Sequence, residues 1–395
     1  MTNPIKLRTR LIELPRDPRR IDEFDGLRGL LVWLTFIIHV LIFCGWYGPT
    51  VRGWNLMTEF FQPTADVFML LSGCVITQLI LLKKESYGRY LWRRGCRILP
   101  AYWIALTLGI WLSGVVIDDF RHLPDTPEAR FYIGLLQLGS MRLTLDSLLH
   151  AALLQGLAPS SLFPLEAFTL LGVAWSLSTE WQFYLIAPTI VRLATANKLA
   201  FIAIGLTCLI AATASSYLIH VFSIAFLPAK ALFFFVGAIS FVCVIRNRDD
   251  VSAFLWLLTS SGGLALGWSI GSGKPSLSTG SAIVWFLVLL SIRFQKPRFI
   301  GEFLRSALMR YLGRISYGTF LFHGAAITIV QAAIWRWVHP TTPGTLILIS
   351  LPASAVVTLI AAALSWQFIE RPFQRIGREH FMGSQTAYTQ KRRSS

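Results

Sequence analysis

Apolar residues occur in blocks of about twenty along this chain, separated by short polar stretches. A helix of about twenty apolar residues crosses the ~30 Å hydrocarbon core of a bilayer. Within lipid the backbone must satisfy its own hydrogen bonds, so blocks of this length are typical of helices. The pattern predicts an all-α, polytopic membrane protein. Eleven segments are apolar enough to be considered as spans, at residues 26–46, 60–82, 99–117, 143–157, 172–191, 199–222, 227–245, 252–270, 279–292, 315–335 and 344–369.

The positions of Lys and Arg predict how many of these segments cross the membrane. The segment 143–157 is short and amphipathic, and it contains Asp146 and His150. If it crossed, the basic segment 293–314 would lie outside the cell, against the preference of Lys and Arg for the cytoplasmic side. If it lies on the outer surface or re-enters from there, every basic segment falls inside. We therefore expect about ten transmembrane helices, with the N- and C-termini both cytoplasmic.

This topology divides the chain into a membrane domain and two tails. Residues 1–25 form a cytoplasmic N-terminal tail, residues 26–376 a ten-span domain, and residues 377–395 a cytoplasmic C-terminal tail. One large segment, 118–171, lies outside the membrane on the external side. The N-terminus is basic but leads into a full-length span without a small-residue cleavage site, which indicates a retained tail rather than a signal peptide.

Composition and charge exclude several other classes. The chain has 395 residues, of which 54% are hydrophobic and only 14% charged, whereas soluble proteins carry about a quarter charged residues. The net charge of +16 does not indicate nucleic-acid binding, because the cations gather between apolar blocks, as they do where charge sets membrane orientation. The five cysteines have no paired spacing, so we expect neither disulfides nor a metal site.

Ionisable residues inside apolar segments are the first candidates for function, because each costs about 2.5–3.5 kcal/mol to insert. Arg28 and His39 lie in the first segment and are eleven residues apart, within about 20° of three full helical turns. They therefore share one face, roughly 16 Å apart along the axis. Asp66 lies in the second segment and Glu180 in the fifth. A snorkelling arginine, a core histidine or a helix-start aspartate is the structural alternative for each residue taken alone.

Three arginines precede the third apolar segment. Arg93, Arg94 and Arg97 occur in RYLWRRGCRILPAYW, and both Arg93 and Arg94 fall near the helical face of Arg97. Paired guanidinium groups match the oxygens of a phosphorylated ligand. Ordinary positive-inside charge or anionic-lipid binding is the alternative.

These segments, in this order, resemble acyltransferase family 3 of membrane O-acyltransferases over about residues 22–376. The resemblance rests on FDGLRGLLVWLTFIIH, DVFMLLSG, RRGCRILPAYW, WSLSTEWQFYL, LGRISYGTFLFH and the late IERP. Met69 and the pair Thr64-Ala65 depart from the family pattern without removing a polar group. Many relatives append an SGNH-type domain, which this chain is too short to contain, so the resemblance is to the stand-alone form.

The resemblance implies an acyltransferase, of a class transferring groups other than aminoacyl groups, in the bacterial inner membrane. Its donor would be a cytoplasmic acyl-coenzyme A, with acetyl-CoA the commonest in the family, and no metal is implied. Its acceptor would be a hydroxyl of an extracytoplasmic glycan such as exopolysaccharide or O-antigen, or of a lipid-linked saccharide. Besides these substrates and membrane lipid we expect no nucleic-acid partner, and the oligomeric state stays open.

Roles for individual residues follow from the same resemblance. His39 is the expected catalytic base or, alternatively, the carrier of the acyl group, and Glu180 or Asp66 would orient it or bind the acceptor. The expected acyl-CoA-binding residues are Arg28, Arg93, Arg94, Arg97 and Tyr102. Further candidates are Lys230, as an oxyanion-stabilising or snorkelling lysine, and Tyr317 and His323, which also fit helix packing.

Two other function classes remain open at this level. Buried His, Asp and Glu in a ten-span bundle also describe a proton-coupled transporter or flippase of an envelope glycan or lipid. Transporters usually show inverted repeats or paired broken helices, and we find neither pattern in the sequence. A lipid-linked glycosyltransferase would more often show acidic loop motifs.

Overall fold

The computed structural model describes residues 21–46, 63–83, 85–272 and 275–379, and these residues form helices and loops without any strand. The long helices are α1 (Asp22–Phe43), α3 (Pro63–Leu82), α4 (Tyr87–Arg121), α7 (Trp175–Ala196), α11 (Asp250–Ser272), α12 (Pro275–Phe294), α15 (Ser316–Trp337) and α16 (Pro343–Ser365). The shorter ones are α5 (Pro127–Met141), α6 (Leu143–Ala151), α8 (Lys198–Thr213), α9 (Ser215–Val221), α10 (Leu227–Ile239), α13 (Arg298–Leu304), α14 (Ala307–Arg314) and α17 (Arg371–Glu379). Single turns are η1 (Gln155–Leu157), η2 (Glu166–Phe168) and η3 (Gly172–Ala174), and η4 (Ser240–Ile245) and η5 (Trp366–Glu370) extend α10 and α16.

Local sequence signals explain where several helices begin. Thr126 accepts a hydrogen bond from the amide of Ala129, and Thr342 accepts one from the amide of Thr345. Each threonine is followed by a proline at the first helical position, where a missing amide hydrogen costs nothing. α5 and α16 therefore begin at signals that the sequence carries by itself.

The all-helical membrane class is confirmed, whereas the expected count of ten spans is not. Among the described residues, six helices are long and apolar enough to cross a membrane, and the pair α8–α9, bent by 69°, makes a possible seventh. α7 falls outside this group although it has 22 residues. Its first half carries serine, threonine, glutamate and glutamine, which lower its mean hydropathy. The cytoplasmic placement of the termini stays a prediction, and residues 1–20 and 380–395 of the two tails lie outside the described residues.

Close helix crossings fix the frame of the membrane domain. A Cβ on Gly237 of α10 would lie 2.0 Å from the carbonyl oxygen of Leu70, and one on Gly73 of α3 would lie 2.2 Å from that of Phe234. Reciprocal glycines of this kind let two backbones touch, as small residues do in membrane helix pairs. α3 and α10 are thereby held in one register, which sets the depth of every side chain they carry.

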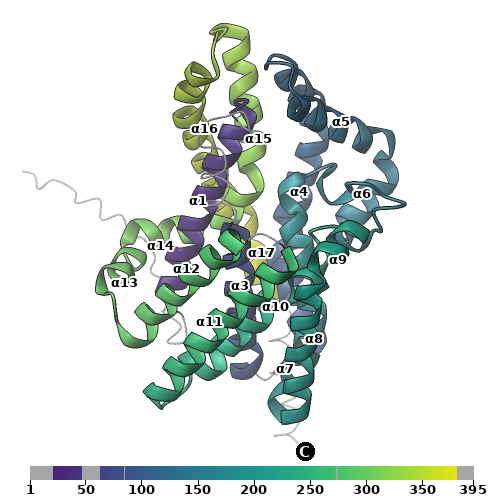
Figure 1. The fold of residues 1–395 in the computed structure, drawn as a ribbon. Coiled ribbons are helices and arrows are strands. Elements are labelled where there is room, and N and C mark those ends of the chain that lie inside the picture. The colour runs from purple at the N-terminus through teal and green to yellow at the C-terminus, as the bar shows by residue number, and fades with distance from the viewer. Residues whose placement is uncertain (1–20, 47–62, 84, 273–274, 380–395) are drawn as a thin grey trace, which may run out of the picture.

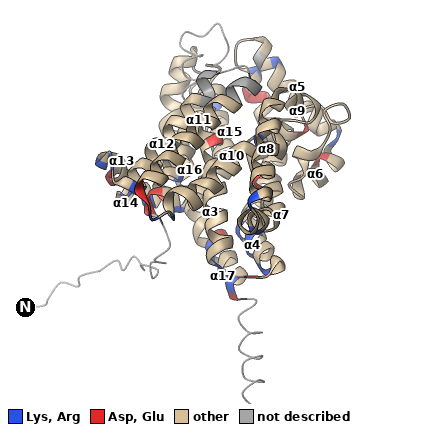
Figure 2. Cartoon of the chain, turned by 60° about the horizontal axis from the view of Figure 1, so that its bottom comes forward, with Lys and Arg blue, Asp and Glu red and all other residues tan. Residues whose placement is uncertain are grey.

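Figure 1 shows α1 beside α15 and α16 on one side, and α4 running up beside α5 and α6 on the other. α13 and α14 pack against the N-terminal part of α1, where α14 approaches so closely that a Cβ on Gly313 would lie 1.9 Å from the carbonyl oxygen of Asp25. Charged residues gather at this level and at the ends of α4 and α17 (Figure 2). The N-terminal ends of α1 and α15 therefore share one polar face of the domain.

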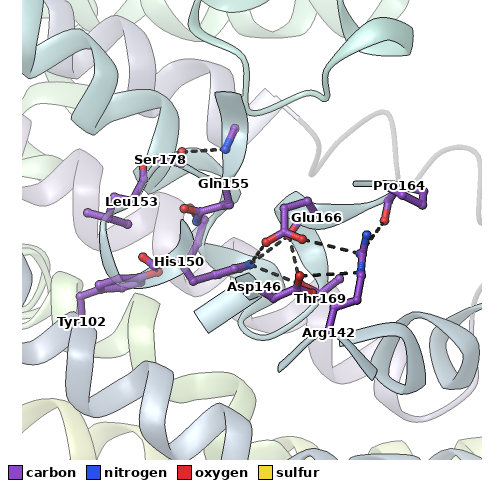
Figure 3. Close-up of polar contacts among 12 residues, drawn as sticks. Tyr102, Arg142, Asp146, His150, Leu153, Gln155, Pro164, Glu166, Thr169 and Ser178 are labelled. Carbon is purple, nitrogen blue, oxygen red and sulfur yellow. Dashed lines mark hydrogen bonds and ion pairs between the residues drawn. The ribbon is translucent and has the colours of Figure 1, made fainter. Parts of the chain in front are cut away.

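The predicted external segment folds into α5, α6 and short turns around a buried polar cluster (Figure 3). Asp146, His150 and Glu166 are almost fully buried. Arg142 lies 3.7 Å from a carboxylate oxygen of Asp146 and 3.6 Å from one of Glu166. Nε2 of His150 donates to the backbone oxygen of Glu166 at 2.9 Å, and Tyr102 of α4 donates to the backbone oxygen of His150 at 2.8 Å. The cluster thus ties the segment together and joins it to α4.

Burial makes the charge state of this cluster depend on pH. Burial, with Asp146 nearby, raises the pKa of Glu166 to about 8, and burial lowers the pKa of His150 to about 4. Glu166 then holds a proton that the unfolded chain releases above its ordinary pKa, so its contribution to stability is lost as the pH rises towards 8. The contribution of His150 has the opposite sign and is lost as the pH falls from its ordinary pKa of 6.5 to 4.

Candidate active site

A cavity of about 100 Å³ lies within the bundle and is lined by residues of α1, α3, α4, α7, α10 and α15. One part of its wall is apolar, with Phe68, Met69, Phe234 and Phe320. The remaining part is strongly polar. Its polar lining residues are Arg28, Ser72, Arg94, Arg97, Ser176, Glu180, Tyr184, Ser316 and Tyr317.

The polar wall has an excess of positive charge. Arg28 is paired with Asp25 at 3.2 Å, one turn earlier on α1. Arg94 is 8% exposed, and its guanidinium lies over the ring of Tyr184, 5.7 Å from the centroid. Within the described part of the chain, neither Arg94 nor Arg97 makes a side-chain hydrogen bond or an ion pair, and Nε of Arg94 is a buried donor without an acceptor. Buried cations without partners are unfavourable, so this wall is suited to an anionic ligand.

Glu180 is the one carboxylate that the described residues contribute to the cavity wall, and it is held by neutral groups. Ser72 of α3 and Tyr184, one turn along α7, both donate to its Oε1. Two hydroxyl donors fix the carboxylate while its other oxygen stays available. Glu180 is therefore a positioned acceptor inside the cationic cavity rather than a partner of His39.

His39 pairs with His323 across α1 and α15. Nδ1 of His323 lies 3.0 Å from the backbone oxygen of Thr319, and its Nε2 lies 3.0 Å from Nδ1 of His39. A carbonyl oxygen only accepts, so Nδ1 of neutral His323 is the donor and its Nε2 is an acceptor. Nδ1 of His39 then carries the hydrogen, which leaves the lone pair on Nε2. The pair thus presents one basic nitrogen on His39, with its tautomer set by His323.

The histidine pair adjoins the cavity but does not line it. Phe320 is a wall residue of the cavity, and its ring centroid lies 6.5 Å from that of His323. On the α1 side, Thr35 bonds to Thr64 at 3.2 Å, and the next residue, Ala65, lines the cavity. Arg28 therefore lines the cavity, whereas His39, expected on the same face of the first helix, does not.

The structure places the other predicted residues away from the cavity wall. Asp66 and Lys230 form a buried ion pair, with 2.8 Å between Nζ and Oδ1. Lys230 is only 3% exposed, so the snorkelling interpretation is wrong for it. Arg93 bonds to Glu85 at 2.5 Å. Tyr102 is fully buried and turns towards the external segment.

Of the predicted residues, the cavity unites Arg28, Arg94, Arg97, Glu180 and Tyr317, which donates to the backbone oxygen of Ile98 at 2.8 Å. Sequence reasoning did not select the residues that hold or enclose this set. Tyr184 had a usable signal, since it follows Glu180 by four residues on one helix face. Ser72 and Phe320 had none beyond their place in the motifs, because their neighbours come from other helices.

A family model described as an acyltransferase domain matches residues 21–366, which is most of the chain. The chain belongs to acyltransferase family 3. This confirms the resemblance that the motifs indicated. The protein is a multi-pass membrane acyltransferase. No curated protein and no solved structure matches the chain.

Proposed function

We propose that this family 3 acyltransferase moves an acyl group, acetyl in the first instance, from cytoplasmic acyl-CoA to a hydroxyl of an extracytoplasmic glycan. The membrane in question is the bacterial inner membrane, and exopolysaccharide, O-antigen or a lipid-linked saccharide is the acceptor. The family supports the enzyme over the transporter alternative. The acceptor class, the acetyl group and the membrane rest on the family resemblance alone.

The cationic wall of the cavity is the observation that supports acyl-CoA as the acyl donor. Arg94 and Arg97 have no carboxylate partner among the described residues, and Arg28 adds a third guanidinium. Coenzyme A brings phosphates on a thin pantetheine arm, and charge-assisted bonds from arginine to phosphate are worth about 1.5–3 kcal/mol each. The phosphates would bind at Arg94 and Arg97, and the arm would extend along the apolar wall towards Phe320.

The chemistry is assigned to the histidine pair. Nε2 of His39 accepts the proton of the acceptor hydroxyl, and the resulting alkoxide oxygen attacks the thioester carbonyl. The carbon–sulfur bond breaks, the thiolate of coenzyme A leaves, and the proton on His39 passes to that sulfur. His323 positions the imidazole and shares the charge of the transient imidazolium. Phe320 lines the cavity next to His323, and we expect its side chain to move when the thioester approaches His39.

Purified protein reconstituted in liposomes with labelled acetyl-CoA and a crude envelope glycan tests the activity directly. Label on the glycan, or release of free coenzyme A that depends on the glycan, is the expected result. His39→Ala should abolish both while its level in the membrane and its melting behaviour match those of the unmodified protein. Transfer retained by this variant would remove His39 from the mechanism.

The donor site has its own test. Arg94→Ala combined with Arg97→Ala should weaken acetyl-CoA binding by at least about tenfold, since even one charge-assisted bond is worth that much. Arg93→Ala is the matched comparison, because Arg93 lies on the same helix but is paired with Glu85. It should change the affinity far less. Equal affinity for acetyl-CoA in the double variant and the unmodified protein would show that these arginines do not bind the donor and serve only as positive charge on the cytoplasmic side.

A further inference from the structure

A second cavity, of about 200 Å³, lies at the polar end of the domain, between the end of α12 and the short helix α13. It is lined by Ser291, Gln295, Arg298, Glu302 and Arg305. All five side chains are polar, and the cavity is separate from the candidate active site. No part of the proposed transfer reaction uses these residues.

The charges of this cavity are of both signs and only partly matched within the protein. Nη1 of Arg305 bonds to Glu23 of α1 at 2.7 Å. Among the residues that the structure describes, Arg298 and Glu302 have no ion pair. Two guanidinium groups and one carboxylate therefore line the same space, and two of these three groups are free to bind a ligand.

The floor of the cavity consists of the hydroxyl group of Ser291 and the backbone of Gly301, which has no side chain. Ser291 is 2% exposed, and its Oγ is a buried polar atom with no hydrogen-bond partner in the part of the chain that the structure describes. A Cβ on Gly301 of α13 would lie 2.7 Å from this Oγ and 3.4 Å from Nη2 of Arg305. The hydroxyl and the second guanidinium nitrogen of Arg305 thus converge above a glycine. A buried hydroxyl usually has a partner, and here a ligand oxygen would supply it.

The opposite face of α13 is apolar and exposed. Phe299 and Phe303 lie one turn apart, with 69% and 50% of their surfaces exposed, and Leu308 on α14 is 62% exposed. In a membrane protein a short helix with such a face lies in the interface, with its apolar side in the acyl-chain boundary. The polar cavity then lies at headgroup depth, in the leaflet on the side where α1 begins.

We propose that this cavity binds the headgroup of a zwitterionic phospholipid, a phosphoethanolamine. The phosphate lies between Arg298 and Arg305 and accepts a hydrogen bond from Ser291, and the ammonium group lies against Glu302. The acyl chains pack on Phe299 and Phe303. The mixed charge argues for this headgroup over an anionic one, because a purely anionic lipid leaves Glu302 facing a negative ligand.

Native mass spectrometry of delipidated protein in detergent tests the proposal, with titrations of phosphatidylethanolamine, phosphatidylglycerol and soluble glycerophosphoethanolamine. Phosphatidylethanolamine should bind several-fold more tightly than phosphatidylglycerol, and the soluble headgroup should compete only weakly. Arg298→Gln should weaken phosphatidylethanolamine binding by about tenfold, the equivalent of one charge-assisted bond. Arg314→Gln removes the same charge from an exposed residue of α14 outside the cavity and should leave binding unchanged.

Two further variants keep the result decisive if Arg298→Gln does not fold. Glu302→Gln should equalise the affinities for the two lipids, and Gly301→Ala should weaken both because its Cβ enters the site. Equal binding of both lipids by the unmodified protein would overturn the proposal. So would a preference that survives Glu302→Gln, or tight binding of the soluble headgroup alone.

Discussion

In the proposed mechanism His323 sets the basicity and orientation of His39, and this relation yields the sharpest test of the catalytic proposal. His323 is fully buried and is bonded at 3.0 Å both to Thr319 and to His39. His323→Ala removes the acceptor that Nε2 of His323 provides for Nδ1 of His39. A hydrogen bond to a charged group is worth about 1.5–3 kcal/mol, so its loss from the imidazolium of the transition state corresponds to a fall in kcat of roughly 10–150-fold.

The effect should fall on kcat and not on the KM for acetyl-CoA, because His323 does not line the cavity that contains Arg94 and Arg97. His323→Gln is the matched variant, since the amide oxygen of glutamine reaches the place of Nε2 and accepts the same hydrogen bond. We expect it to restore most of the lost kcat. The assay is the initial rate of coenzyme A release from proteoliposomes with saturating glycan, after checking that all three proteins melt alike.

Two outcomes would refute this reasoning. An unchanged kcat in His323→Ala would show that the pairing has no part in the reaction. Equal losses in the alanine and glutamine variants, with normal folding, would show that the hydrogen-bond acceptor at Nε2 is not what matters.

Other predictions concern stability. The stability of the unmodified protein should fall by up to about 1.4 kcal/mol per pH unit between the ordinary pKa of Glu166, 4.5, and its raised pKa of about 8. Glu166→Gln removes this titration, so its stability should gain on that of the unmodified protein between pH 6 and pH 8. Thermal melts at both pH values check this, and a constant difference between the two proteins would contradict it. Asp66→Asn or Lys230→Met alone should each lower the stability by about 3–5 kcal/mol, because each removes one partner of a buried ion pair. The double variant should recover much of this loss in thermal melts in detergent, and additive losses would count against the pair. Gly237→Ala should destabilise the domain by about 1–3 kcal/mol, because its Cβ meets the backbone of α3. Gly263→Ala is the control, since a Cβ there enters open space and should not destabilise the domain. Similar melting temperatures for the two variants would show that the α3–α10 crossing is not tight.

The length of the apolar blocks allowed the sequence to predict the class of fold, and helical periodicity grouped some of the residues that line the cavity. Arg94 and Arg97 do line one cavity, as their spacing on a single helix indicates, and Arg28 and Glu180 from the family motifs line the same cavity. The span count could not be predicted as securely. Polar side chains such as the glutamate and glutamine of α7 lower the mean hydropathy of a helix, so hydropathy alone does not decide whether such a helix crosses the membrane.

Pairings between helices could not be read from the sequence. His39 meets a histidine 284 positions away, and Asp66 meets Lys230 at a separation of 164. Periodicity gives the face of a residue on its own helix but not the helix that packs against it. For the same reason Glu180, expected near His39, is held by Ser72 and Tyr184.

A structure with a non-hydrolysable thioether analogue of acetyl-CoA, determined in a lipid nanodisc, tests the central claim most directly. Our account predicts the phosphates against Arg94 and Arg97, a displaced Phe320 ring, and the acyl group within hydrogen-bonding reach of Nε2 of His39. An analogue bound outside this cavity, or with its acyl group remote from His39 while Phe320 stays in place, would contradict it.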